Sequence, residues 1–130
     1  MKWQIDYIEK EGIVSANASG KTTLDEHRKF TAEAIACARK HNTHKIFIDF
    51  TKMAPDLTVL QIDDLPGILE QAGVTPEYKM AVLFDFSSPL KNNFVFFGNV
   101  TIIKSLKVKP FADKKSAFEW LNQDPADKPQ

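Results

Sequence analysis

Two short segments far apart in the sequence repeat one pattern: bulky apolar residues followed by an aspartate, a phenylalanine and a hydroxyl-bearing residue. They read Ile46-Phe47-Ile48-Asp49-Phe50-Thr51 and Val82-Leu83-Phe84-Asp85-Phe86-Ser87. Short runs that are this apolar, with β-branched and aromatic side chains, are typical of strands buried on both faces of a sheet. Because a helix is predicted after each run, we expect two successive parallel strands of an α/β sheet.

The remaining elements are predicted from turn residues, helix caps and apolar periodicity. The strands that carry the repeated pattern are expected at residues 45–50 and 79–86. Before the first of these strands we expect a β-hairpin from Trp3 to Ala16 and a helix that is capped by Thr22 or Thr23 and runs to about Lys40. Between the two strands we expect a loop over 51–57 and a helix from Thr58 that is kinked or restarted at Pro66 and ends at Gly73. After the second strand we expect a helix that begins at Ser88-Pro89, a strand over 108–111 and a final helix capped by Asp113.

This order predicts a single α/β domain over residues 1–123, followed by a flexible C-terminal tail over 124–130. Its sheet is expected to be mixed and mostly parallel, with about five strands, an N-terminal β-hairpin and about four flanking helices. The length of 130 residues is ordinary for one domain with a continuous core. Lys plus Arg and Asp plus Glu both number 17, a balance that gives no basic field for nucleic acid.

Cysteine usage and the N-terminal sequence bear on the compartment. The single cysteine, Cys37, has no partner for an internal disulfide, and the first residues, Met1-Lys2-Trp3-Gln4-Ile5-Asp6, lack the apolar segment of a signal peptide. No apolar run approaches the roughly 18 residues that would span a bilayer. We therefore expect a cytoplasmic protein with no membrane span.

The end of the chain carries the most specific sequence pattern. It reads Val108-x-x-Phe111-x-Asp113-x-x-x-Ala117-x-x-Trp120-Leu121. With the β-β-α-β-α-β-α-β-α order over residues 2–122, this pattern resembles the STAS domains of anti-sigma-factor antagonists, in particular the small bacterial SpoIIAA-like and SEC14-like domains. The resemblance implies the SpoIIAA-like fold and a protein that acts by binding partners rather than by catalysis.

The same resemblance implies a phosphorylation site at the start of the helix that follows the central strand. Thr58 occupies that position loosely, because the family places an aspartate directly before the phosphorylated serine, whereas Leu57 separates Asp56 from Thr58 here. Thr58 also suits a helix N-cap without any modification. Both interpretations of Thr58 stay open.

Two phenylalanines are the strongest candidates for a binding surface. On an ideal helical wheel, Phe94 and Phe97 lie off the apolar face of the helix after Ser88. Leaving two aromatic side chains in water forgoes roughly 1.5–3 kcal/mol each. They are therefore expected to be covered by the neighbouring loop over residues 89–93, a protein partner, a second copy, an apolar ligand or the core itself. Met53 and Thr58 are expected to border the same surface.

Three other groups of residues suggest chemistry with less support. Asp49 and Asp85 end two expected parallel strands and would meet at the carboxyl edge of the sheet, as an acidic site or as acceptors for loop amides. Gly20-Lys21-Thr22 resembles the end of a P-loop, but Ser15 stands where the phosphate cradle needs its first glycine. Cys37, His41 and His44 lack the further ligands of a zinc site, so no metal and no cofactor is predicted.

Together, these observations predict a non-enzymatic binding or regulatory module that acts through protein–protein association, with a homodimer as one form of it. The alternative is a carrier or sensor of a small apolar, lipid-like ligand. A third hypothesis is an enzyme that uses Asp49 and Asp85.

Overall fold

The computed structural model describes residues 2–20, 23–53, 67–83 and 107–123. Its five strands are β1 (Lys2–Ile8), β2 (Ile13–Gly20), β3 (Lys45–Met53), β4 (Lys79–Leu83) and β5 (Lys107–Phe111). Its helices are α1 (Leu24–Lys40), α4 (Lys114–Leu121) and a short helical segment over residues 67–71. The α/β class predicted from the sequence is therefore confirmed.

The strands form one sheet in which each pairs with its neighbours in sequence, in the order β1-β2-β3-β4-β5. Strands β1 and β2 are an antiparallel hairpin, and every later pairing is parallel. The mixed, mostly parallel sheet of five strands with an N-terminal hairpin is as expected.

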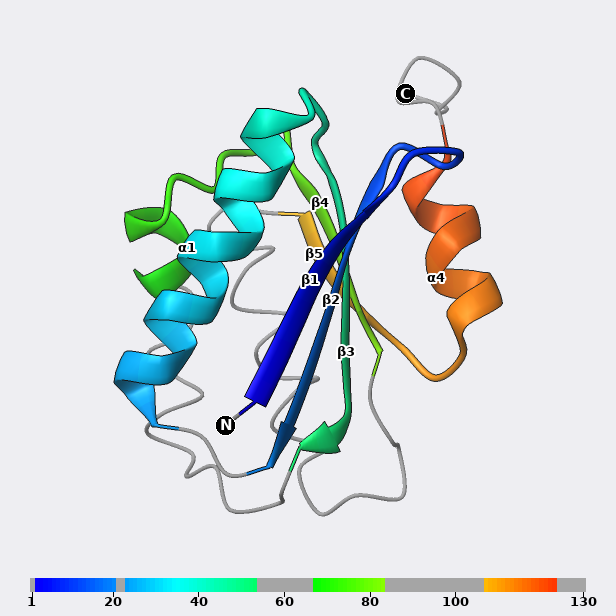
Figure 1. Ribbon diagram of the computed structural model, residues 1–130. Helices are drawn as coiled ribbons and strands as arrows, with labels where there is room; N and C mark the ends of the chain where they lie inside the picture. The colour runs from blue at the N-terminus through cyan, green and yellow to red at the C-terminus, as the bar shows by residue number, and fades with distance from the viewer. Residues whose placement is uncertain (1, 21–22, 54–66, 84–106, 124–130) are drawn as a thin grey trace.

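Helices cover both faces of the sheet (Figure 1). Helix α1 and segment 67–71 lie on one face, where Phe30, Ile48 and Leu69 belong to the larger hydrophobic core. Helix α4 lies on the opposite face, where Ala117 and Leu121 pack with Phe47 and form the smaller core. The alternation of side chains along β3 divides its residues between these two cores.

Local sequence signals set where the helices begin and end. Thr23 caps α1 through a capping box with Glu26, and Asp113 caps α4 by accepting a hydrogen bond from the Ser116 backbone N–H at 2.8 Å. Segment 67–71 ends in a Schellman motif, in which Gly73, at φ +96°, donates to the Glu70 carbonyl oxygen at 3.1 Å. The predicted caps at Thr23 and Asp113 and the predicted helix end at Gly73 are confirmed.

Strand β3 is longer than expected. The sequence predicts a loop from residue 51, but residues 51–53 extend β3 because Lys52 and Met53 pair with Ser19 and Gly20 beyond an irregularity in the β2–β3 register. The predicted strand over 79–86 is seen as far as Leu83. The predicted helices at Thr58 and Ser88, and the predicted tail over 124–130, lie outside the described residues.

Candidate binding site

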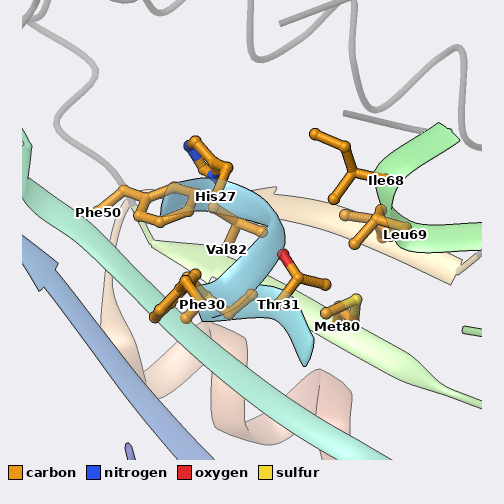
Figure 2. Close-up of a pocket in the computed structure, with 10 residues that line it drawn as sticks. His27, Phe30, Thr31, Phe50, Ile68, Leu69, Met80 and Val82 are labelled. Atoms are coloured by element: carbon orange, nitrogen blue, oxygen red, sulfur yellow. The ribbon is translucent and has the colours of Figure 1, made fainter. Parts of the chain in front are cut away.

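A small cavity lies between α1 and the sheet (Figure 2). Its volume is about 30 Å³. The wall is built from α1, segment 67–71 and three parallel strands, and it is almost entirely apolar. The described residues that line it are His27, Phe30, Thr31, Ile48, Phe50, Ile68, Leu69, Met80, Val82 and Val108.

The cavity lies on the face of the sheet beneath α1. Met80 and Val108 are the second residues of β4 and β5, whereas Phe50 and Val82 lie in the second halves of β3 and β4. The cavity therefore extends along the sheet toward the carboxyl ends of the parallel strands, the edge at which open α/β sheets usually bind their ligands.

His27 is the unusual member of the wall. Its side chain belongs to a residue that is only 3% exposed, and its Nε2 atom has no hydrogen-bond partner among the described residues. The imidazole meets Phe50 and Phe30 edge to face, with ring centres 5.6 and 6.4 Å away. A buried nitrogen without a partner costs about 1–3 kcal/mol, so the fold retains His27 at the expense of stability.

Burial also fixes the charge of this histidine. Loss of solvent around the ring lowers the pKa of His27 from 6.5 to about 4, against a smaller opposing effect of the nearby Glu26 carboxylate. His27 is therefore neutral at pH 7. A neutral imidazole has one N–H and one lone pair, so Nε2 is a donor in one tautomer and an acceptor in the other.

Thr31 is the second polar residue in the wall. It follows His27 by one helical turn on the same face of α1 and is 6% exposed. Figure 2 shows its hydroxyl facing the space between His27 and Leu69. Two groups able to form hydrogen bonds are thus placed in an otherwise apolar wall.

The size of the cavity limits what it holds without rearrangement. A volume of about 30 Å³ admits a water molecule or one small chemical group, whereas a cavity that binds benzene measures about 150 Å³. Met80, only 1% exposed, forms part of the wall. Its unbranched thioether chain has three rotatable bonds and adapts its shape more readily than the surrounding rings.

Most of the residues predicted to bind a partner lie outside the described part of the chain. These are Thr58, Phe94 and Phe97; Asp85, predicted for the acidic site with Asp49, also lies outside it. Met53 is the last residue of β3, at the carboxyl edge, and the structure describes its backbone only. The structure therefore does not test whether these residues form one surface.

Asp49 lies on the other face of the sheet from the cavity. Register places it in a row across the strands, beside Asn17, which in turn pairs with Gln4. Its carboxylate accepts hydrogen bonds from the backbone N–H of Thr51 at 2.9 Å and from the Thr51 hydroxyl at 2.6 Å. These hydrogen bonds are those expected if Asp49 acts as an acceptor for nearby backbone N–H and hydroxyl groups.

His41 and His44, the two histidines near Cys37 in the sequence, each contact an aromatic or acidic side chain elsewhere in the fold. His41 stacks on Tyr7 with ring centres 3.9 Å apart, and His44 lies 3.4 Å from the Glu77 carboxylate. Burial raises the pKa of the Cys37 thiol. Within the described ranges, no three His, Cys, Asp or Glu side chains are grouped closely enough to hold a metal ion.

The sequence matches no protein-family model and no curated protein. The resemblance to STAS domains therefore rests on the residue pattern of the C-terminal segment and on the order of the elements. In the described parts of the chain, no helix is both long enough and apolar enough to cross a bilayer.

Sequence reasoning missed both polar residues of the cavity. His27 falls on the helical spacing that joins it to Thr31, Ala34 and Ala38, all of which are buried. That periodicity was the available signal. The sequence gives no sign that the wall would leave Nε2 unpaired, because this depends on strands 20 to 80 residues away.

Proposed function

We propose that this chain is a cytoplasmic, non-enzymatic binding and regulatory module of the STAS type, which acts by associating with a protein partner or with a second copy of itself. The order of the sheet carries this proposal. The described sheet, a hairpin followed by parallel strands, is consistent with the order of elements on which the resemblance rests.

The association surface is proposed at the carboxyl edge of the sheet. Strands β3 and β4 both end there, at Met53 and Leu83, so the segments that carry Thr58, Phe94 and Phe97 leave the described fold from this edge. Apolar side chains on such a surface would supply most of the association energy. Phosphorylation of Thr58, where it occurs, would add negative charge at the same place.

Native mass spectrometry of the purified protein tests this proposal. The wild type is expected to show a dimer that the double variant Phe94→Ser, Phe97→Ser loses. A matched control, Lys114→Ser, Lys115→Ser, places the same number of serines on exposed positions of α4 and should keep the dimer. A wild type that stays monomeric at every concentration would reject self-association.

A second function is favoured by a specific observation, the apolar cavity beneath α1. We propose that the module carries or senses a small, largely apolar ligand there. Mass spectrometry under the same gentle conditions would reveal a co-purified small molecule as an added mass on the chain. Loss of that mass in Leu69→Trp, which fills the cavity, would place the molecule at this site.

A further inference from the structure

We propose that the outer edge of β1 pairs antiparallel with the same edge of a second copy of this chain, with Lys2 of each copy directly opposite Asp6 of the other. The two sheets then join into one continuous sheet. This inference goes beyond the proposed association through Phe94 and Phe97, because it uses a different surface and stands without it.

Strand β1 forms one edge of the sheet, with α1 on one side of it and α4 on the other (Figure 1). All seven of its residues pair with β2 in unbroken register, and β1 pairs with no other described strand. The backbone N–H and C=O groups that point away from β2 are therefore not used by any described strand. Such a row of groups is a template for a further strand.

The opposite edge of the sheet is protected against pairing. Among the described strands it is formed by β5, in which Pro110 has no backbone N–H and Lys107 and Lys109 add positive charge. Proline and lysine are residues that commonly block pairing at a sheet edge. Strand β1 has no proline, no break in register and one charge of each sign. Of the two described edges, β1 is therefore the one that accepts a further strand.

The fold of each copy restricts how two β1 strands can pair. Trp3 and Ile5 pack against the core beneath α1. The residues that alternate with them, Lys2, Gln4 and Asp6, are exposed and face the other side of the sheet. In a symmetric antiparallel pair, residues directly opposite each other lie on the same face. Each exposed residue of one copy therefore lies opposite an exposed residue of the other.

Charge complementarity selects the register. With the twofold axis at Gln4, Lys2 of each copy lies opposite Asp6 of the other, which gives two pairs of opposite charge. With the axis at Ile5, Lys2 lies opposite Ile8, and neither charge faces an opposite one. With the axis at Asp6, the two Asp6 carboxylates face each other, which is destabilising. The charges of the strand therefore favour the register centred on Gln4.

The other pairs in this register also fit. Trp3 lies opposite Ile5 twice, and an aromatic residue beside a β-branched one stabilises adjacent strands. The Trp3 ring is held on the α1 side of the sheet, where its Nε1 donates a hydrogen bond to the Glu33 carboxylate. The two Gln4 side chains meet at the axis, where each amide can donate to the other and accept from it. Within one copy, Gln4 donates to the Asp6 carboxylate at 3.0 Å, a hydrogen bond that leaves the Asp6 charge in place.

The size of the contact sets its strength. Residues 2–6 of each copy pair, so the buried surface falls in the range below about 1,200 Å² that is typical of weak, transient complexes. We therefore expect a Kd of about 0.1–1 mM. The contact forms where copies are concentrated, and it is not populated at the micromolar concentrations used for native mass spectrometry.

NMR dilution of the ¹⁵N-labelled full-length protein tests the pairing. Between millimolar and micromolar concentration, we expect the backbone amide signals of residues 2–6 to shift along a dimerisation curve, while those of β5 stay in place. The double variant Phe94→Ser, Phe97→Ser should give the same shifts. A wild type that is monomeric in native mass spectrometry but keeps these shifts would reject the surface of Phe94 and Phe97 and support the pairing of β1.

Charge-reversal variants test the register. Lys2→Glu places a carboxylate opposite Asp6, and Asp6→Lys places an ammonium group opposite Lys2. Each should weaken self-association about two- to thirtyfold, the range for two cross-strand charge pairs. An equimolar mixture of the two variants has two pairs of opposite charge in the mixed dimer, so it should associate with the wild-type Kd. Lys109→Glu makes the same change at an exposed lysine of β5 and should leave the Kd unchanged. Circular dichroism checks that each variant is folded.

Three outcomes would overturn the proposal. Amide signals of residues 2–6 that do not depend on concentration up to the millimolar range would reject pairing through β1. Shifts that vanish in the Phe94→Ser, Phe97→Ser variant would assign self-association to that surface instead. Single charge variants that associate as tightly as the wild type, or a mixture that associates no more tightly than either variant alone, would reject the pairing of Lys2 with Asp6.

Discussion

The ammonium group of Lys79 lies 4.7 Å from the centre of the Trp120 ring and donates a hydrogen bond to the Trp120 carbonyl oxygen. Lys79 is the first residue of strand β4 and is only 4% exposed. It also reaches the carbonyl oxygen of Gln123 at 3.4 Å, just beyond the end of α4. A positive charge is thus held where the carbonyl groups of α4 point, which is the favourable end of the helix dipole.

Replacing Lys79 with methionine should lower the free energy of unfolding by about 1–3 kcal/mol. Methionine keeps the apolar part of the side chain but leaves the carbonyl oxygens of Trp120 and Gln123 without this donor. Urea denaturation measures the change. Lys109→Met is the matched control, because Lys109 is exposed on β5 and its ammonium group lies 5.4 Å from the Phe111 ring; equal effects of the two substitutions would contradict the role given to Lys79.

Gly73→Ala should be destabilising by about 1–2 kcal/mol, the usual cost of a side chain in a left-handed conformation. The backbone at Gly73 has φ +96°, and an added Cβ would clash with a guanidinium nitrogen of Arg39. The companion variant Gly67→Ala meets nothing within 4 Å and lies in a helix, so it should be neutral or stabilising by up to about 1 kcal/mol.

Thermal unfolding of both glycine variants measures the difference. Arg39→Ala in the Gly73→Ala background removes the steric part and should recover part of the loss. If the two glycine variants are equally stable, the positive φ at Gly73 does not constrain the sequence.

Stability should depend on pH through His27. The folded pKa is about 4 and the reference value is 6.5, so the unfolded chain binds the proton more readily. The free energy of unfolding should therefore fall as the pH decreases from 6.5 to 4, by roughly 3 kcal/mol at 1.36 kcal/mol for each unit of pKa difference, and this contribution should level off below pH 4.

His27→Phe is the variant that isolates this contribution. It should be more stable than the wild type at pH 5, and its stability should change less between pH 6.5 and 4. Urea denaturation across this range measures both. A wild-type profile that matches the variant would show that His27 does not titrate as a buried group.

Thr23→Ala should destabilise the protein by about 0.5–2 kcal/mol through loss of the cap of α1. The Thr23 hydroxyl accepts from the Glu26 N–H at 3.2 Å, and the Glu26 carboxylate accepts from the Thr23 N–H at 3.1 Å. Thr23→Ser retains the hydroxyl and should stay within about 0.5 kcal/mol of the wild type. Denaturant unfolding of the pair tests the capping box, and equal losses would argue against it.

Interactions between residues close together in the sequence explain which parts of the fold were predictable. Thr23, Gly73 and Asp113 act within one turn of chain, so their roles follow from residue type and spacing alone. The length of β3 did not follow, because residues 51–53 are held in the strand by pairing with β2, more than 30 residues earlier.

The cavity and the buried Lys79 were less predictable, because they too depend on segments that are far apart in the sequence. The burial of Lys79 depends on α4, about 40 residues later, and the cavity at His27 depends on side chains from five separate elements. At the carboxyl edge of the parallel strands the sequence predicts an acidic site of Asp49 and Asp85, whereas the structure places Asp49 on the face of the sheet opposite the cavity. The association surface assigned to Phe94 and Phe97 remains a prediction.

The consecutive strand order has a consequence for how the chain folds during synthesis. Each strand adds to the edge formed by the one before it, so none has to be inserted between two strands already paired. The sheet can therefore grow in the order in which the ribosome releases it. Among the described elements, α4 is the helix that packs on the face carrying Phe47 and Ala81, so these side chains gain their contacts with Ala117 and Leu121 only after the last strand has been synthesised.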